Sequence, residues 1–367
     1  MQVLVVNPGS SSLKLSVLDP ADGVVDEHEV PSVEGQAESK EIEGFLARAP
    51  AVAAAGVRFV HGGPSFRQST LVAGDVLERL EQVADLAPLH NPPALVALGA
   101  LLHLRPRIPV VACFDTAFFA ALPPAAATYA LPHRWSFEWG IRRFGFHGLS
   151  HAYASRRGAQ LLDRPPEHLR LVTCHLGAGA SLAAVSGGVP VDTTMGFTPL
   201  DGLVMATRSG SVDPGVLIWV QRHGGLSIDD VERALDRESG LLGLTGTSGD
   251  MRRVLATAEQ GDERAQLAIA VYIHRLRGAV AAMAAAMGGL DAVVFTGGVG
   301  ENSAPVREQT CAGLGFLGVT LDLDRNAGTS STDRDIATGD SPARVLVVGA
   351  REDREIAREV RRLSPPV

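Results

Sequence analysis

The sequence predicts an α/β protein built from two related domains. Short apolar runs such as Val3–Val6 and Val110–Phe114 are typical of buried strands. A longer stretch, Glu263–Met287, carries apolar residues three and four positions apart and predicts a helix. Strands that alternate with helices favour an α/β architecture. Because 367 residues are many for a single hydrophobic core, two domains are expected.

A pattern repeated in the two halves indicates that the domains are related. VLVVNPGSSSLKLSVLD, near the N-terminus, is echoed in the second half by LVTCHLGAGASLAAVSGG. Each is an apolar strand, a turn of small residues and a second apolar strand, although few letters match, so a common hairpin recurring by chance is the alternative. We expect domains at residues 1–147 and 148–351, with loops facing each other across a cleft and a C-terminal helix, residues 352–363, packing back on the first domain.

The other strands expected from short apolar runs follow in chain order. They are Leu13–Leu18, Val57–His61, Leu171–His175, Ser181–Val185, Ala292–Thr296 and Arg344–Val348.

Composition excludes several classes of partner. The net charge is −8 and no run of Lys or Arg occurs, so we expect neither nucleic acid nor an acidic membrane surface as a partner. Cys113, Cys174 and Cys311 are far apart, which supports neither a zinc site nor a disulfide framework and favours small buried side chains. No basic-then-apolar leader is evident, and the apolar stretch Gly278–Leu290 is too short to span a bilayer, so a cytoplasmic protein is expected.

The turn NPGSSSLK is the first candidate phosphate loop. Gly9 permits a tight turn whose N–H groups converge on an anion, and Ser10 and Ser12 add hydroxyl donors. Lys14 adds a positive charge, and Asn7 can hydrogen-bond a phosphate oxygen or a metal-bound water. A plain polar hairpin turn is the alternative, because the motif is not G-x-x-x-x-G-K-[ST].

A second glycine cluster, VVFTGGVGENS, follows an expected strand, with a helix expected after Asn302. Gly298 and Gly300 would let a flat or phosphorylated ligand lie close to the backbone. The cluster is not G-x-G-x-x-G, so a packed turn between strand and helix is the alternative.

Several charged and imidazole side chains lie within stretches of small or apolar residues. Arg58 precedes VHGG, and Arg208 lies among small residues in MATRSGSVDP. His147 is in FGFHGLSH and His90 in LAPLHNPP, while Asp115 ends the apolar run VVACFDT. That position puts a carboxylate at the C-terminal edge of a strand, where α/β proteins place their sites. Each residue alone also fits an ion pair, a helix cap or a buried histidine.

Two other chemistries are not supported by the motifs. His147 and His151 are four residues apart, but no H-E-x-x-H glutamate accompanies them, which argues against zinc. No G-x-S-x-G occurs, which weakens a serine-hydrolase interpretation.

Taken together, the blocks resemble the acetate and propionate kinase family of the sugar-kinase, heat-shock-ATPase and actin-like superfamily. The resemblance runs in family order from residue 3 to about residue 360. The blocks that carry it are NPGSSSLKLSV, VRFVHGG, LAPLHNPPAL, FDTAF, ALP, FGFHGLSH, CHLGAG, MGFTPLDGL, TRSGSVDP, SGDMR, VVFTGGVGENS and REDREIA.

This resemblance implies a fold, a reaction and partners. The fold would be two duplicated actin-like (ribonuclease H-like) domains with a central interdomain cleft. The reaction would be reversible, direct in-line transfer of a phosphoryl group from ATP to acetate, giving acetyl phosphate and ADP, with Mg²⁺ (or Mn²⁺). The resemblance and the long Ala-rich helix at Glu263–Met287 together suggest a homodimer that forms through the second domain. Acetate is ionised at neutral pH, so the task is to offset repulsion between two anions, which suits arginines, a histidine and a divalent ion.

Residue roles follow from the resemblance position by position. Arg58 and Arg208 would bind acetate and the transferring phosphoryl group, and His147 would donate a hydrogen bond to it. His90 and Asp115 are the other implied catalytic residues, and Asn7 and Glu352 would bind the metal. The implied acyl pocket consists of Val60, Leu89, Phe146 and Pro199. The implied nucleotide-binding residues are Ser10, Ser12, Lys14, His175, Gly177, Ala178, Gly179, Asp250, Met251, Arg252, Gly298, Gly300, Glu301 and Asn302.

Departures from the family pattern keep alternatives open. Ala178 stands where the family usually has an amide, and Met251 where an aromatic is common. The stretch between Leu18 and Arg58 is also shorter than usual. Val60 fits acetate better than propionate, although one methylene is worth only about 1–3 kcal/mol. The alternatives are a propionate or butyrate kinase, and an ATP-binding regulator that has lost its chemistry.

Overall fold

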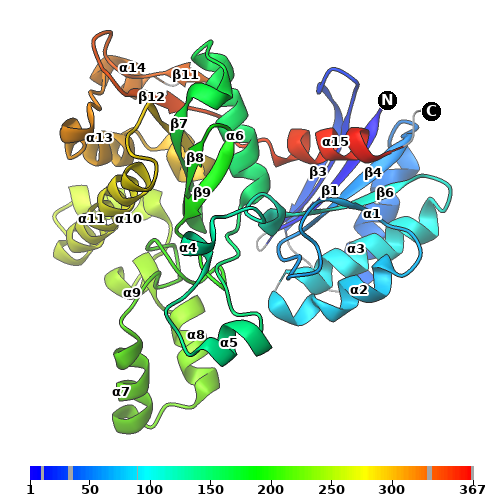
Figure 1. Ribbon diagram of the computed structural model, residues 1–367, viewed down its shortest axis with the longest axis horizontal. Helices are drawn as coiled ribbons and strands as arrows, with labels where there is room; N and C mark the ends of the chain where they lie inside the picture. Colours follow the sequence, from blue (N-terminus) through cyan, green and yellow to red (C-terminus); the bar gives the residue numbers. More distant parts are fainter. Residues whose placement is uncertain (10–11, 32–35, 89, 329–332, 365–367) are drawn as a thin grey trace. The chain divides into compact units, whose positions relative to one another are not determined.

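The computed structural model describes residues 1–9, 12–31, 36–88, 90–328 and 333–364 (Figure 1). The chain forms two compact units that interleave along the sequence. The first unit comprises Met1–Ala120, Phe146–Tyr153 and Arg351–Val367, and the second comprises Ala121–Gly145 and Ala154–Ala350. The sequence predicts domain boundaries at residues 147/148 and 351/352, and these stay predictions.

The first unit is built on one sheet, whose strands are β1 (Val3–Pro8), β2 (Ser12–Leu18), β3 (Val24–Pro31), β4 (Ala54–Phe59), β5 (Thr70–Leu71) and β6 (Val110–Phe114). The strand order is β3-β2-β1-β4-β6-β5. β1 to β3 form an antiparallel meander, whereas β1, β4 and β6 are parallel and β5 runs antiparallel to β6. The parallel strands therefore end at one edge, where Asn7, Arg58 and Asp115 lie.

The second unit is built on a sheet of β7 (Arg170–Leu176), β8 (Ala180–Ser186), β9 (Val189–Thr193), β10 (Ala292–Thr296), β11 (Arg334–Asp335) and β12 (Arg344–Val347). Its order is β11-β12-β10-β7-β8-β9. Counted from β9, the sheet is again an antiparallel meander of β9, β8 and β7, then the parallel strands β7, β10 and β12, then the short antiparallel edge strand β11. The two sheets match strand for strand in order and direction. The predicted duplication is confirmed, and a hairpin recurring by chance does not explain it.

Helices cover both faces of the first sheet. On one face, α1 (Gln36–Arg48) and α3 (Asn91–Leu104) bury Phe45 and Leu98 against the strands. On the other, α15 (Glu352–Leu363) packs Ile356 and Val360 against β1, β4 and β6. A Cβ at Gly56 in β4 would collide with Ile356, so glycine allows this close approach. The C-terminal helix thus places Glu352 in the first unit.

The remaining helices, in chain order, connect or cover the sheets. They are α2 (Val76–Gln82), α4 (Pro124–Ala127), α5 (His133–Glu138), α6 (Gly148–Leu161), α7 (Pro214–Gly224), α8 (Ile228–Arg237), α9 (Gly240–Thr245), α10 (Met251–Glu259), α11 (Glu263–Ala286), α12 (Gly297–Asn302), α13 (Ala304–Ala312) and α14 (Leu323–Ala327). Short 3-10 turns lie at Ala84–Leu86, Asp115–Ala117, Pro166–His168 and Gly315–Leu317.

Helix α11 agrees with its prediction within one residue. By length and composition alone it would suffice to cross a membrane. In the structure, however, it packs against β7, β8, α9, α10 and α13 and buries Ala268, Tyr272, Leu276 and Val280. It is therefore the central helix of the second unit.

Four predicted or missed elements differ from the expectation. The strand expected at Val57–His61 is β4, which begins at Ala54 and ends at Phe59. The glycine cluster GGVGEN is itself a helix, α12, because Gly297 adopts a φ of +78° and turns the chain directly from strand into helix. The helix expected after Asn302 is α13. β3 and β9 are edge strands with polar faces, so their hydrophobic pattern is weak.

The three cysteines are buried and form no disulfide. Burial raises the pKa of each thiol, to about 12 for Cys311. Because the thiolate is the reactive form, these side chains behave as small apolar residues, as predicted.

Candidate active site

A buried ion pair between Arg58 and Asp115 lies at the carboxyl edge of the first sheet. Arg58 is in β4, Asp115 follows the neighbouring strand β6, and the register sets Arg58 beside Cys113. Arg58 Nε donates to Asp115 Oδ1 at 3.2 Å, and Nη2 donates to Oδ2 at 2.7 Å. The Asp115 side chain is 1% exposed and that of Arg58 12%. Asp115 therefore fixes the plane of the guanidinium with both of its oxygens.

Asn7 and Glu352 complete the surroundings of Arg58. Asn7 is the penultimate residue of β1, and its Oδ1 accepts a hydrogen bond from Arg58 Nη1 at 3.0 Å. Burial by itself would lower the pKa of Arg58, but attraction and hydrogen bonding from Asp115, with a further contribution from Glu352, raise it. The guanidinium stays charged, and three of its five N–H donors have partners in the described part of the chain.

His147 adopts an unusual backbone conformation beside Asp115. Its φ is +54°, in the left-handed region that costs a non-glycine residue about 1–3 kcal/mol. The next residue, Gly148, packs so tightly that a Cβ would collide with the carbonyl oxygen of Asp115. The start of α6 is thereby pressed onto Asp115, which places half-buried His147 at the same edge.

The other histidines have different surroundings. His90 is half-buried and immediately precedes α3. His151 is fully buried in α6 and its ring meets that of Phe119 edge-on at 5.9 Å. His147 lies outside the helix, so the two histidines do not present a helical pair.

The predicted acyl-pocket residues fall in both units. Val60 and Phe146 are buried in the first unit, where the ring of Phe146 meets that of His61 edge-on at 5.3 Å. Pro199 is half-buried in the second unit. Leu89 lies outside the described residues.

Arg208 is held in the second unit by an acid that the sequence interpretation missed. Arg208 Nε donates to Asp236 Oδ1 at 2.9 Å, and Nη1 approaches the carbonyl oxygen of Pro199 at 3.4 Å. The two side chains are 15% and 23% exposed. Asp236 belongs to α8, a helix with charged residues at most positions, so nothing in the pattern distinguishes it from a solvated acid.

A pocket of about 770 Å³ lies at the carboxyl ends of β7 and β10 in the second unit. That volume suits a nucleotide-sized ligand. Predicted residues that line it are Gly177, Ala178, Asp250, Met251, Arg252, Gly298 and Asn302. Residues that the sequence interpretation missed include Ala206, Thr207, Leu241, Leu255, Tyr272 and Val299, apolar or small side chains that only the fold brings together.

The SGDMR segment forms one wall through the start of α10. Asp250 caps the helix by accepting from Arg252 N at 3.0 Å, and it pairs with the Arg252 guanidinium at 2.8 Å. These hydrogen bonds lower the pKa of Asp250. Met251 is buried, while the Arg252 side chain is 91% exposed.

Helix α12 forms another wall, with two of its predicted residues turned elsewhere. Gly298 and Asn302 line the pocket, and Asn302 Nδ2 donates to Gly298 O at 2.9 Å. Gly300 is buried against Phe295. The carboxylate of Glu301 instead accepts a hydrogen bond from Ala350 N at 2.9 Å.

The turn of CHLGAG closes the pocket at the end of β7. Gly177 N donates to Gly179 O at 2.9 Å, which makes a tight hairpin turn, and half-buried His175 precedes it. Ala178 is exposed at the tip, and its carbonyl accepts from Ala206 N at 3.0 Å.

The first candidate phosphate loop is only partly described. Ser10 lies outside the described residues. Ser12 Oγ donates to Glu29 Oε1 at 2.7 Å, and Lys14 Nζ lies 3.5 Å from the same oxygen. Both side chains thus contact Glu29 of the neighbouring strand β3, which the β2–β3 register sets opposite Lys14.

No group of three or more His, Cys, Asp or Glu side chains with metal-binding geometry occurs in the part of the chain that the structure describes. Mg²⁺ does not require one, because it is commonly held by one or two carboxylates with phosphate oxygens and water. The oxygen donors of Asn7 and Glu352 beside Arg58 fit such an open site better than a closed cage.

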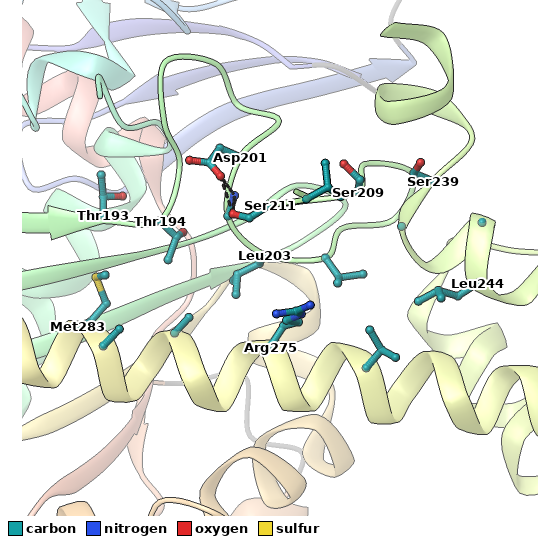
Figure 2. A pocket seen from close by; sticks show the side chains of 18 of the residues that line it. Thr193, Thr194, Asp201, Leu203, Ser209, Ser211, Ser239, Leu244, Arg275 and Met283 are labelled. Atoms are coloured by element: carbon teal, nitrogen blue, oxygen red, sulfur yellow. Dashed lines mark hydrogen bonds between the residues drawn. The ribbon is translucent and has the colours of Figure 1, made fainter. Parts of the chain in front are cut away.

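A second pocket, of about 790 Å³, lies between α11, the end of β9 with the loop after it (residues 192–212) and the start of α9 (residues 238–244) (Figure 2). It contains none of the predicted site residues. On its wall, Asp201 accepts hydrogen bonds from Ser211 Oγ at 2.5 Å and from Gly202 N at 2.9 Å. These bonds brace the loop that carries Pro199 and Arg208.

Duplicated sheets with matching strand order, together with a nucleotide-sized pocket at the carboxyl edge of one of them, define a protein of the actin-like class. Comparison with known proteins narrows this class. Residues 38–358 match the model of the acetokinase family. Acetate kinase from Synechococcus sp. (strain JA-2-3B'a(2-13)) is 54% identical over 313 residues, which are 85% of this chain and 77% of that protein.

Solved structures give the same result. The crystal structure of Porphyromonas gingivalis acetate kinase superposes with a TM-score of 0.91 at 36% identity, covering 99% of both chains. That of a propionate kinase from Francisella tularensis subsp. tularensis SCHU S4 superposes with a TM-score of 0.90 at 34% identity, again over 99% of both. The chain belongs to the acetokinase family, whose members transfer phosphoryl groups to a carboxyl acceptor.

Proposed function

We propose that this protein catalyses reversible phosphoryl transfer from ATP to acetate, giving ADP and acetyl phosphate. Membership of the acetokinase family supports the reaction class. The observation that carries the proposal is the guanidinium of Arg58, locked by both oxygens of a buried aspartate at a sheet edge. A rigid cation of this kind suits a reaction between two anions.

The acceptor needs no general base in this proposal. Acetate, a carboxylic acid with a pKa of roughly 4–5, is already ionised at neutral pH and is therefore a ready nucleophile. Arg58, Arg208 and His147 would bind the carboxylate and the equatorial oxygens of the phosphoryl group during in-line transfer, with His90 in support. Asp115 is a positioning residue for Arg58, since both of its oxygens are engaged.

The nucleotide would occupy the 770 Å³ pocket of the second unit. Adenosine would lie against Gly298, Asn302 and Met251, with the thioether of Met251 as a soft contact for the base. The phosphates would lie against the small-residue turn at Gly177 and Ala178, with the N–H of Ala178 as a donor.

Asn7 and Glu352 would hold Mg²⁺, with Mn²⁺ as an alternative ion of similar ligand preference. The ion would neutralise charge on the phosphates. The oxygens of both side chains beside Arg58 support this assignment.

Acetate is the favoured acceptor, and propionate or butyrate is the alternative. Buried Val60 and Phe146 would contact the methyl group, and valine leaves less room than a smaller residue. The likeness to a propionate kinase is as close in fold as that to an acetate kinase, so fold alone does not separate the two acceptors. A nucleotide-binding regulator without chemistry is disfavoured by the intact Arg58–Asp115 pair.

We further propose a cytoplasmic homodimer that associates through the second unit. Exposed apolar side chains on α7, in the turn after it and at the start of α8 support this: Val216, Ile218, Trp219, Leu226 and Ile228 are 41–75% exposed. Three buried, unpaired cysteines fit a reducing compartment.

A hydroxamate assay tests the proposed function. Purified protein with ATP, Mg²⁺ and acetate is expected to form acetyl hydroxamate, and parallel reactions with propionate and butyrate rank the acceptors. Arg58→Lys, which keeps the charge but cannot make the bidentate bond to Asp115, is expected to lose most of the activity. No acyl phosphate from any of the three acids would refute the proposal.

A further inference from the structure

The loop that carries Arg208 is fastened to the end of α8 on both sides of the arginine. Thr207 Oγ1 donates to the carbonyl oxygen of Asp236 at 2.8 Å, and Ser209 N donates to that of Leu235 at 3.0 Å. Arg208 itself is 15% exposed and bonds Asp236 through Nε. The hydrogen bonds of the loop and the side-chain bond to Asp236 therefore all hold Arg208 against the C-terminal end of α8.

The bond through Nε decides which edge of the guanidinium remains available. A guanidinium binds a carboxylate or phosphate in bidentate fashion through two parallel N–H groups. In Arg58 the Nε–Nη2 edge is occupied by Asp115. In Arg208, Asp236 takes only Nε, and Nη1 donates one long hydrogen bond to the Pro199 carbonyl oxygen at 3.4 Å. Within the described residues, Nη2 of Arg208 thus donates no hydrogen bond and can pair with an anion together with the second N–H of Nη1, whereas in Arg58 all three nitrogens already donate to Asp115 or Asn7.

The position of Asp236 is unfavourable for an acid unless it has such a partner. Asp236 lies in the last turn of α8, where the helix dipole places partial negative charge and disfavours a carboxylate. The first turn of the same helix has the favourable arrangement, with Asp230 completing a capping box with Ser227. The cation of Arg208 offsets the cost at Asp236.

We propose that Asp236 is a positioning residue that orients Arg208 so that its Nη1–Nη2 edge receives the oxygens of an anionic substrate. The inference rests on the proposed function and adds to it the residue that aims the second arginine. The substrate class is a carboxylate or a phosphoryl group, each of which presents two oxygens to one fork.

Kinetics of matched variants test this role. Asp236→Ala frees Arg208 to rotate, and a misplacement of about 1 Å costs roughly 100-fold in rate, so kcat is expected to fall about 10- to 100-fold. Removing the competing carboxylate leaves the KM for acetate unchanged or lower. Asp236→Asn keeps an oxygen acceptor for Nε and is expected to recover most of the kcat. Asp230→Ala, which breaks the cap of the same helix without touching Arg208, is the control and is expected to keep wild-type kinetics.

A spectroscopic readout separates failure of this inference from failure of the proposed function. In ¹H–¹⁵N spectra of the wild-type protein, Arg208 Nε–H, assigned by its absence in Arg208→Lys, is expected to exchange slowly with water. The Asp236→Ala variant is expected to lose this protection from exchange, and the Asp236→Asn variant is expected to keep it. Either variant that folds suffices for the test. A rapidly exchanging wild-type signal overturns the inference, as does an equal loss of kcat in the Asp230 variant. A protected signal without acyl phosphate formation refutes the proposed function and leaves the orienting role of Asp236 supported.

Discussion

Asp115 and Arg58 share two hydrogen bonds, of 3.2 and 2.7 Å, although 57 residues separate them in the chain. The parallel register of β4 and β6 brings them together, and burial makes the pair sensitive to loss of either partner. Removing one partner of a buried pair costs about 3–5 kcal/mol, because the other charge remains buried without compensation.

Asp115→Ala is therefore expected to lower the free energy of unfolding by a few kcal/mol and to reduce acyl phosphate formation by orders of magnitude. Urea unfolding and the hydroxamate assay measure the two effects. Asp335→Ala, which breaks the 2.6 Å pair with Arg344 in the second unit, is the control for losing an ion pair and is expected to retain activity. Wild-type activity in Asp115→Ala would remove Arg58 orientation from the mechanism.

Gly148 is expected to tolerate no side chain. A Cβ there collides with the carbonyl oxygen of Asp115, so Gly148→Ala must displace either α6 or the residues around Asp115. We expect a lower midpoint of thermal unfolding and a large loss of kcat. Gly278→Ala in α11 is the matched control, because no atom lies within 4 Å of its Cβ position. That substitution is expected to stabilise the protein by about 0.4–1 kcal/mol, since alanine restricts the unfolded chain. Equal effects of the two substitutions would contradict the packing argument.

The sequence predicts those parts of the fold in which burial leaves a clear pattern. β6, and β1 from Val3 to Val6, are apolar because these strands are covered on both faces, and both were predictable. The edge strand β3 carries the polar run Asp26–Glu29 at its centre and was not predictable. In the site, Asp115 could be predicted from its place after a strand. Asp236 could not, because only the tertiary contact with Arg208 distinguishes it from the other acids of α8.

Ala178 offers a gain-of-function test at the phosphate end of the nucleotide pocket. It is exposed at the tip of the β7–β8 turn and lines the pocket. Ala178→Asn adds a donor, and one hydrogen bond contributes about 0.5–1.5 kcal/mol, so kcat/KM for ATP is expected to rise roughly 2- to 12-fold. Ala178→Val adds volume without a donor and is the control. No gain with asparagine, or the same gain with valine, would show that this position makes no hydrogen bond to the nucleotide.

Asp291 is expected to contribute to stability at neutral pH and to lose that contribution in acid. Burial acts to raise its pKa, but hydrogen bonds from Arg170 N at 2.9 Å and Nε at 3.0 Å outweigh burial, so the pKa is lowered below 3.8. Since the folded-state pKa lies below the unfolded value, the contribution is complete above the unfolded pKa and disappears as pH falls through the folded one. Urea unfolding between pH 7 and pH 3 should show a smaller decline in Asp291→Asn than in the wild type. Parallel declines would exclude Asp291 as a source of the acid sensitivity.

Arg307 links the stability of the second unit to nucleotide affinity. It is 1% exposed, and burial lowers its pKa to about 10, so it remains charged at neutral pH. Its Nη1 donates to the carbonyl oxygens of Gly300 and Glu301 at 2.9 and 2.8 Å, and its Nε and Nη2 bond Asn326. The arginine thus holds the C-terminal end of α12, whose other face lines the nucleotide pocket.

Arg307→Met keeps much of the volume but leaves these oxygens without donors, at a cost of about 1–3 kcal/mol for each buried acceptor. We expect reduced stability and, in the folded fraction at low temperature, a several-fold higher KM for ATP with the KM for acetate unchanged. Arg307→Lys, which supplies one donor group in place of the fork, is expected to lie between methionine and wild type. If the KM values for ATP and acetate rise together, Arg307 stabilises the second unit as a whole and has no particular role in placing α12.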